Sequence, residues 1–341
     1  MRKKLIALLV CLAMIVSLAG CTAKASGEEN ADSPSAEKTV KAASLEELNL
    51  AVGTAPGPVT YPLAQMAELN SNIVLKPWQS GEQLTAMLTS KEVQLCSAPI
   101  SNALLCYNKG LDTKLLMVTV WGMLYVMSTE NEAASLQDLK GKEVVLSGQG
   151  GIHDLIFRHI LIKNNINPDT DLTLTYMDMS EASTMLASGA IKYAVLNEPQ
   201  SSIACLNATK SGVALNRIMD LTEEWGKLPG QENARFPMAG IVVVEDSGVT
   251  PEQVAGFEAA YIDTTDWVAA NPEAIGPIVE KYVPTMKAAA VTQSLKYARL
   301  QPESAIDCQD EVEALFKELS QTADMKAFGG KLPDEGFYYQ N

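Results

Sequence analysis

Five loops in the sequence place glycine, proline and small hydroxyl residues directly before a predicted helix: residues 53–60, 79–82, 97–101, 147–153 and 197–200. A helix N-terminus presents backbone N–H groups without intrahelical partners, together with a partial positive charge. Such ends therefore bind ligands that accept hydrogen bonds. Each loop taken alone is better explained as a turn or helix cap, but five loops that meet at one cleft favour a binding site.

Residues for other chemistries are scarce. The chain has two histidines, His153 and His159, which excludes a metal site built from several histidines. The HExxH, GxxxxGK[ST] and GxSxG motifs of zinc proteases, phosphate loops and serine hydrolases are absent. Residues 148–153 begin like a GxGxxG dinucleotide-binding motif, but His153 replaces the third glycine. We predict no catalytic residues, no metal and no cofactor; His153 is either a ligand contact or part of a helix start, and His159 a packed or surface residue.

The charge of the chain also excludes a class of partners. The 341 residues include 41 acidic and 26 basic side chains, for a formal net charge of −15. An acidic surface repels phosphate backbones, so we expect no nucleic-acid partner.

The N-terminus has the pattern of an exported protein. Residues 1–21 combine three early cationic residues with an apolar stretch, as a secretory signal peptide does. Leu18-Ala19-Gly20-Cys21 resembles the lipobox of bacterial lipoproteins, which implies a lipid on Cys21 and a membrane-anchored protein on the extracytoplasmic face. Cleavage without lipidation and an uncleaved anchor are the alternatives. Residues 22–44 are expected to form a flexible tether.

Strand and helix patterns alternate along the rest of the chain. Strands are predicted at 48–52, 73–76, 93–96 and 115–120, with helices at 61–69, 82–90 and 100–109 between them. This alternation predicts a parallel sheet with helices on both faces. The four remaining cysteines are spread widely and are expected to be buried free thiols: Cys96, Cys106, Cys205 and Cys308.

The pattern then begins again after a longer apolar strand at 121–128. Further strands are predicted at 143–146, 172–176, 193–196 and 213–218, with helices at 152–164 and 181–188. A strand at 236–245 returns the chain to the first unit. Helices follow at 251–270, 272–282, 290–298 and 309–321, the first two with a cap residue and a proline at their starts.

Four segments carry a resemblance to a known family: residues 78–83, 135–142, 147–151 and 185–199, the last of which reads MLASGAIKYAVLNEP. Their order resembles the substrate-binding lipoproteins of ABC importers, in particular the nitrate/sulfonate/taurine group, which also includes binders of thiamine-pyrimidine precursors. The resemblance covers roughly residues 46–285. Residues 90–93 depart mildly from the small-residue step usual in the family.

The resemblance implies an α/β fold of the periplasmic-binding-protein-like type II, with two doubly wound lobes joined by a hinge of two crossovers. The first lobe would comprise 45–128 and 236–341, and the second 129–235, with crossovers near 126–129 and 234–238. It also implies a monomer that captures a small organic solute between the lobes by hinge closure and delivers it to the transmembrane subunits of an ABC permease.

The same resemblance implies a set of ligand-lining residues, matched position by position: Thr54, Ala55, Gly57, Gln79, Ser80, Ser97, Ala98, Gln149, Gly151, His153, Asn197 and Glu198. Trp121, near a crossover, would stack on a planar ligand or serve as a core aromatic residue.

The candidate loops contain no arginine or lysine, and Glu198 and Asp154 would oppose an anion. We therefore favour a neutral, heteroaromatic or cationic solute over a taurine-like one. Two alternatives remain: an enzyme of the same fold related to pyrimidine-precursor synthesis, and a surface-anchored sensor without an importer.

Overall fold

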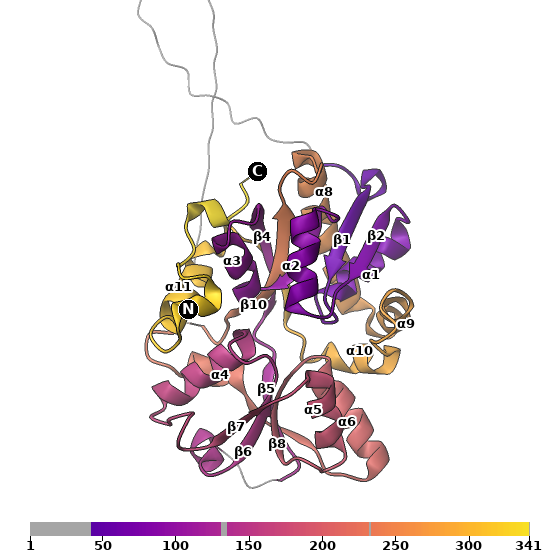
Figure 1. The fold of residues 1–341 in the computed structure, drawn as a ribbon. Coiled ribbons are helices and arrows are strands. Elements are labelled where there is room, and N and C mark those ends of the chain that lie inside the picture. The colour runs from indigo at the N-terminus through magenta and orange to yellow at the C-terminus, as the bar shows by residue number, and fades with distance from the viewer. Residues whose placement is uncertain (1–41, 131–134, 232, 341) are drawn as a thin grey trace, which may run out of the picture. The chain divides into compact units, whose positions relative to one another are not determined.

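The described part of the chain, residues 42–130, 135–231 and 233–340 of a computed structural model, forms two β-sheets with flanking helices (Figure 1). We name the six-stranded sheet and its helices lobe 1, and the five-stranded sheet and its helices lobe 2. The expected signal peptide, the expected lipidation site Cys21 and residues 22–41 of the expected tether lie outside the described residues.

Lobe 1 contains a mixed sheet in the order β11-β4-β10-β3-β1-β2. Its strands are β1 (Leu50–Thr54), β2 (Ile73–Pro77), β3 (Leu95–Pro99), β4 (Thr113–Trp121), β10 (Pro237–Val244) and β11 (Leu300–Ser304). β1 pairs parallel with β2 and β3, whereas β10 lies antiparallel between β3 and β4. The wholly parallel sheet expected from the alternation is thus interrupted by the strand that returns from lobe 2.

The helices of lobe 1 are α1 (Thr60–Leu69), α2 (Gly81–Ser90), α3 (Ile100–Asn108), α8 (Pro251–Ala270), α9 (Pro272–Tyr282), α10 (Ala288–Ser294) and α11 (Gln309–Leu319). The start of α8 shows why its bounds follow from the sequence. Thr250 accepts a hydrogen bond from the Gln253 backbone N–H at 3.3 Å, and Pro251 occupies the first helical position. α10 ends at Ser294, four residues before the predicted end.

Lobe 2 contains a mixed sheet in the order β7-β6-β8-β5-β9. Its strands are β5 (Leu124–Ser128), β6 (Glu143–Leu146), β7 (Thr173–Tyr176), β8 (Tyr193–Asn197) and β9 (Asn216–Asp220). Its helices are α4 (Ile152–Lys163), α5 (Met179–Ala187), α6 (Gln200–Ser211) and α7 (Leu221–Gly226). The central strands of both sheets are apolar and buried on both faces, which is why they read as continuous hydrophobic runs.

The chain passes from lobe 1 to lobe 2 at Gly122, so the strand expected over 121–128 begins only at Leu124, and Trp121 instead ends β4. Gly122 has a φ of +73°, a conformation that glycine adopts without strain, and its N–H donates to the Phe236 carbonyl at 2.9 Å. A Cβ at this position would lie 2.2 Å from Thr222 Oγ1. Residues 124–128 therefore belong to lobe 2, and the crossover lies a few residues before the one expected.

One strand had no clear sequence signal. β11 has the sequence LQPES, and it pairs antiparallel with the outer side of β4. A short polar segment with a proline is tolerated at a sheet edge but lacks the alternation that identifies strands. Among the helices of the described residues, none is long and apolar enough to cross a lipid bilayer.

Candidate functional site

A cavity of about 90 Å³ lies between the two lobes. Its walls come from the loop after β1, the end of β3, the start of α4, the end of β8 and the crossover strands. The lining residues are Ala55, Pro56, Gly57, Pro58, Val59, Ser97, Ala98, Pro99, Val120, Met123, Ile152, His153, Asn197, Met238 and Ala239. The carboxyl ends of parallel strands are where α/β sheets bind ligands.

Three helices begin at this cavity. Val59 is the N-cap of α1, Pro99 is the N-cap of α3, and Ile152 and His153 are the first two residues of α4. Each helix N-terminus carries a partial positive charge. The cavity therefore favours the electron-rich atoms of a solute.

Six of the predicted ligand-lining residues meet at this cavity: Ala55, Gly57, Ser97, Ala98, His153 and Asn197. The Ala55 backbone N–H donates to Ser97 Oγ at 3.0 Å, which joins the first and third of the predicted loops. Four sequence segments that are far apart in the chain thus line one cavity, two of them from lobe 1 and two from lobe 2.

His153 and Asn197 are the polar side chains of the lobe 2 wall. Asn197 Nδ2 lies 3.5 Å from His153 Nε2. Burial lowers the pKa of His153 from 6.5 to about 4, so the imidazole is neutral at pH 7. Asn197 Oδ1 is buried and has no hydrogen-bond partner within the described ranges. An unpaired buried carbonyl costs about 1–3 kcal/mol, which a donor on a bound solute would recover.

The cavity is small relative to an organic ring. Its volume of about 90 Å³ is below the ~150 Å³ of an engineered protein cavity that binds benzene. A ring-sized solute therefore requires the flexible side chains of Met123 and Met238 to rearrange within the lining. No group of three or more His, Cys, Asp or Glu side chains arranged to hold a metal ion occurs in the part of the chain that the structure describes.

A family model described as NMT1/THI5 like matches residues 72–275, which is more than half of the chain. The chain belongs to the NMT1/THI5-like family. Search of the curated proteins gave no match to this NMT1/THI5-like chain.

Solved structures share the fold of this NMT1/THI5-like protein. An ABC transporter from Parabacteroides distasonis is 23% identical, with a TM-score of 0.71 over 85% of this chain and 98% of that one. The periplasmic aliphatic sulphonate binding protein SsuA from Escherichia coli is 14% identical, with a TM-score of 0.60 over 86% and 94%. The periplasmic nitrate-binding protein NrtA from Synechocystis PCC 6803 is 14% identical, with a TM-score of 0.53 over 76% and 74%. The predicted periplasmic-binding-protein-like fold is confirmed.

The two acids expected to oppose an anion do not face the cavity of the NMT1/THI5-like chain. Asp154 Oδ1 accepts from Tyr176 Oη at 2.7 Å and from Arg158 Nε at 2.9 Å, and Asp154 Oδ2 accepts from the Gly150 N–H at 2.8 Å. That sequence argument against an anion is wrong, because the charge of Asp154 is compensated within lobe 2, as is that of Glu198.

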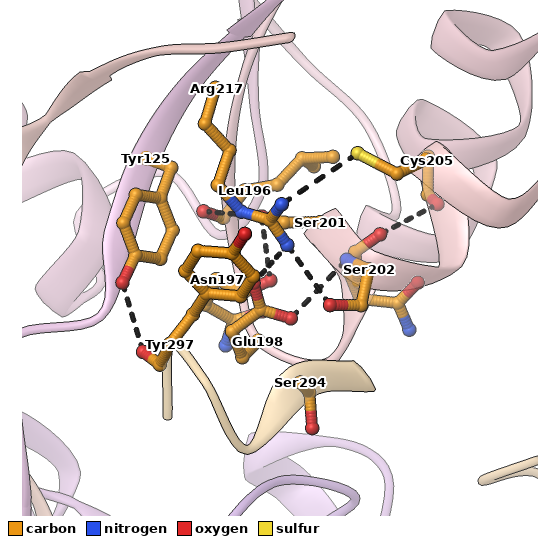
Figure 2. Close-up of polar contacts among 12 residues, drawn as sticks. Tyr125, Leu196, Asn197, Glu198, Ser201, Ser202, Cys205, Arg217, Ser294 and Tyr297 are labelled. Atoms are coloured by element: carbon orange, nitrogen blue, oxygen red, sulfur yellow. Dashed lines mark hydrogen bonds and ion pairs between the residues drawn. The ribbon is translucent and has the colours of Figure 1, made fainter. Parts of the chain in front are cut away.

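Glu198 is fully buried and pairs with Arg217, whose Nη2 lies 2.5 Å from Glu198 Oε1 (Figure 2). Burial raises the pKa of the Glu198 carboxyl, while Arg217 and Ser202 oppose that rise. Glu198 therefore acts as an internal partner of Arg217 and lies behind Asn197 instead of lining the cavity.

Trp121 also lies outside the cavity lining. Its indole N–H donates to the Gln301 carbonyl at 2.8 Å, and the Arg235 guanidinium lies 3.8 Å from its ring centroid. With 2% of its surface exposed, Trp121 matches the alternative given for it, a core aromatic residue at the crossover.

Five further predicted residues lie outside the cavity lining: Thr54, Gln79, Ser80, Gln149 and Gly151. Thr54 lies beneath the first loop, where its Oγ1 contacts Thr60 Oγ1 at 2.7 Å. Ser80 caps α2 by accepting from the Gln83 N–H at 3.3 Å, and Gly151 is the N-cap of α4. Thr54 and Gly151 adjoin segments that carry lining residues, whereas the loop of Gln79 and Ser80, also expected at the cleft, contributes none.

Sequence reasoning missed the apolar lining contributed by the crossovers, which comprises Val120, Met123 and Met238. These residues have no polar atoms that would mark a binding site, and hydrophobic periodicity places them in ordinary buried strands. Their place beside the cavity follows from the arrangement of β4, β10 and the crossover, which becomes visible only once both sheets are placed.

Proposed function

We propose that this chain is the extracytoplasmic solute-binding component of an ABC importer and that it captures a small uncharged organic solute between its lobes. The observation that carries the proposal is a cavity lined by both lobes, in a fold shared with sulphonate-binding and nitrate-binding proteins. Hinge closure around the solute would be favoured by contacts that both lobes make only when shut. The closed form would then dock on the membrane permease as a monomer.

The lining residues support an uncharged solute. Among the described lining residues there is no Lys, Arg, Asp or Glu to neutralise an ion, and burial of an unpaired charge is costly. Pro56, Pro58 and Pro99 lack the N–H groups with which loops bind anions. The positive ends of three helices oppose a cation. Of the solutes favoured by the sequence, a neutral heteroaromatic one fits these walls best.

His153 and Asn197 suggest how such a solute would be oriented. Asn197 Oδ1 offers an acceptor to an N–H group, and the neutral His153 ring offers one donor and one acceptor nitrogen. An aminopyrimidine carries an exocyclic donor beside a ring acceptor, so it would satisfy both side chains. The apolar surfaces of Met123 and Met238 would contact the ring faces.

The lining residues also support a protein that binds its solute without catalysis. Of the described lining residues, His153 is the one with a titratable side chain, burial lowers its pKa to about 4, and its polar neighbour is the amide of Asn197. A general base needs a nucleophile or substrate proton within hydrogen-bond reach. We therefore propose that the solute leaves the protein unchanged.

Attachment to the membrane is proposed from the sequence of the N-terminus. Residues 1–21 would direct export, and a lipid on Cys21 would hold the mature protein on the extracytoplasmic face of the cell membrane. Replacement of Cys21 by serine would release the protein from washed membranes, and intact mass would show the loss of the lipid.

The experiment that tests the function is calorimetric titration of the purified folded body with pyrimidine, 4-aminopyrimidine, choline, taurine and nitrate, with mass spectrometry of any co-purified solute. Saturable binding of a neutral heterocycle without chemical change supports the proposal. Tight binding of taurine or nitrate would overturn the solute class, and conversion of a bound compound would favour an enzyme of the same fold. A neighbouring permease and ATPase gene pair separates an importer component from a surface-anchored sensor.

A further inference from the structure

The segment that leads from α10 to β11 contacts both lobes. α10 packs against α9 of lobe 1 and against α6 of lobe 2, and Figure 1 shows it between these helices. Tyr61 Oη of α1 contacts Ser294 Oγ at 2.6 Å, which fixes the end of α10 to lobe 1. Residues 294–299, which we name the strap, therefore span the two lobes in addition to the crossovers at Gly122 and before β10.

Tyr297 of the strap lies on Arg217 of lobe 2. The Arg217 guanidinium carbon is 3.7 Å from the Tyr297 ring centroid and 5.6 Å from that of Tyr125. Tyr125 Oη donates to the Tyr297 carbonyl at 2.9 Å (Figure 2). The strap thus covers the guanidinium, and a cation held over an aromatic face gains more when water is removed.

A second contact follows two residues later in the strap. Arg299 Nη2 lies 2.5 Å from Asp220 Oδ2, at the end of β9, the strand that carries Arg217. The Arg299 carbonyl accepts from the backbone N–H of Trp121 in lobe 1 at 3.1 Å. Contacts along the strap therefore alternate between the lobes, so separation of the lobes must break one set of them.

Arg217 also contacts Glu198, the residue that follows Asn197 of the cavity wall. Its Nη2 donates to Glu198 Oε1 at 2.5 Å and to Ser202 Oγ at 2.9 Å. Glu198 follows Asn197, whose Oδ1 is unpaired in the cavity wall. The Arg217 side chain is 14% exposed and that of Glu198 is 0% exposed, so this pair is held in a water-poor site between the strap and the cavity wall.

We propose that Tyr297 and Arg217 form a latch that stabilises the closed arrangement of the lobes and holds the Asn197 end of β8 in its binding position. The latch rests on the proposed solute-binding function and assigns a positioning role to two residues outside the cavity lining. When the lobes separate, Tyr297 leaves Arg217 and the guanidinium is hydrated. The latch therefore sets how much of the solute-free protein is closed, and through that population the apparent affinity.

The test compares Tyr297→Ala with Tyr297→Phe, because both retain the backbone carbonyl bound by Tyr125 and only the alanine removes the ring. The first readout is the radius of gyration of the solute-free protein by small-angle X-ray scattering. We expect a larger radius for Tyr297→Ala and the wild-type value for Tyr297→Phe. Arg217→Lys keeps a cation beside Glu198 without the planar group, and it should also give the larger radius. Circular dichroism establishes that each variant is folded.

The second readout is calorimetric affinity for 4-aminopyrimidine. Tyr297→Ala should weaken it about tenfold and Tyr297→Phe less than about twofold, since a desolvated cation–π contact is of that size. Equal radii and equal affinities for wild type and Tyr297→Ala would overturn the latch while leaving solute binding intact. If wild type binds none of the tested solutes, the proposed solute class fails, and the scattering comparison still decides the latch.

Discussion

His153 Nε2 lies 3.5 Å from Asn197 Nδ2, although the residues are separated by 44 positions in the sequence. The start of α4 carries His153, and the end of β8 carries Asn197. Both ends point into the cavity because β6, which leads to α4, pairs parallel with β8. This register places a neutral imidazole and an unpaired amide oxygen on one wall.

Asn197→Ala is the first prediction. Removal of the buried, unpaired Oδ1 should weaken binding of 4-aminopyrimidine by about tenfold to a hundredfold, the range for a hydrogen bond of about 1.4–3 kcal/mol. The free energy of unfolding should change little or rise, because an unsatisfied buried acceptor is removed. Titration calorimetry and urea denaturation measure the two effects. His153→Ala should weaken the same binding, and Gln79→Ala, outside the cavity lining, serves as the control.

Gly122→Ala is predicted to destabilise the crossover between the lobes. An alanine at a φ of +73° is strained, and its Cβ would meet Thr222 Oγ1 at 2.2 Å. We expect a loss of about 2–5 kcal/mol in the free energy of unfolding, from backbone strain and overpacking together. Urea denaturation monitored by circular dichroism gives this value.

Gly110→Ala is the matched control for Gly122. Gly110 has a φ of +83°, but a Cβ there would have nothing within 4 Å. This variant should lose only the about 1–2 kcal/mol of backbone strain. Equal losses in the two variants would mean that the contact with Thr222 does not constrain the crossover.

The sequence predicted those elements whose signals are local. α8 and α9 begin where the cap residues and prolines at 250–251 and 271–272 indicated, and both have the predicted bounds. The loops that carry Ala55, Ser97 and Asn197 were also predictable, because loops after parallel strands meet at one edge of a sheet, whereas the residues themselves came from the family resemblance. These features depend on a few neighbouring residues and on one general rule of sheet architecture.

The features that escaped prediction depend on contacts between distant segments. Arg217 lies in a strand whose sequence gives no reason to pair it with Glu198, 19 positions earlier. Tyr297 was expected in a helix, yet α10 ends at Ser294 and leaves it in the strap. Single-sequence patterns carry no information on which lobe a side chain meets, so both residues become visible only once the sheets are placed.

Asp154→Ala should destabilise lobe 2 strongly. The Asp154 side chain is 4% exposed and accepts hydrogen bonds from Arg158, Tyr176 and the backbone N–H of Gly150. Its removal deprives the Tyr176 hydroxyl and the Gly150 N–H of this acceptor and leaves Arg158 with one carboxylate partner, Asp169, and we expect a loss of about 2–4 kcal/mol in the free energy of unfolding. Asp169→Ala is the control, because Asp169 pairs with the same Arg158 but is 70% exposed. It should lose less than about 1 kcal/mol, and similar losses in both variants would contradict the importance of burial here.

The stability of the protein should fall with pH below neutrality because of buried histidines. Burial lowers the pKa of His159 from 6.5 to about 4; Lys163 adds to this effect and Glu318 opposes it. His159 is fully buried, and its Nδ1 contacts Thr322 Oγ1 at 2.9 Å. Between about pH 6.5 and 4 the unfolded chain binds a proton that the folded protein excludes, so the free energy of unfolding decreases as pH falls, and above pH 6.5 this contribution vanishes.

His159→Gln tests this pH dependence, because glutamine remains polar toward Thr322 but does not titrate. As pH falls from 7.5 to 4.5, the free energy of unfolding of wild type should decrease relative to that of the variant. The slope is at most about 1.4 kcal/mol per pH unit. Urea denaturation at four pH values measures it, and carboxylates that titrate in both proteins cancel in the difference. A difference that stays constant with pH would contradict the prediction, because His159 would then be protonated equally in the folded and unfolded states. An ion pair with Glu318, whose Oε2 lies 3.6 Å from His159 Nε2, would explain such a result.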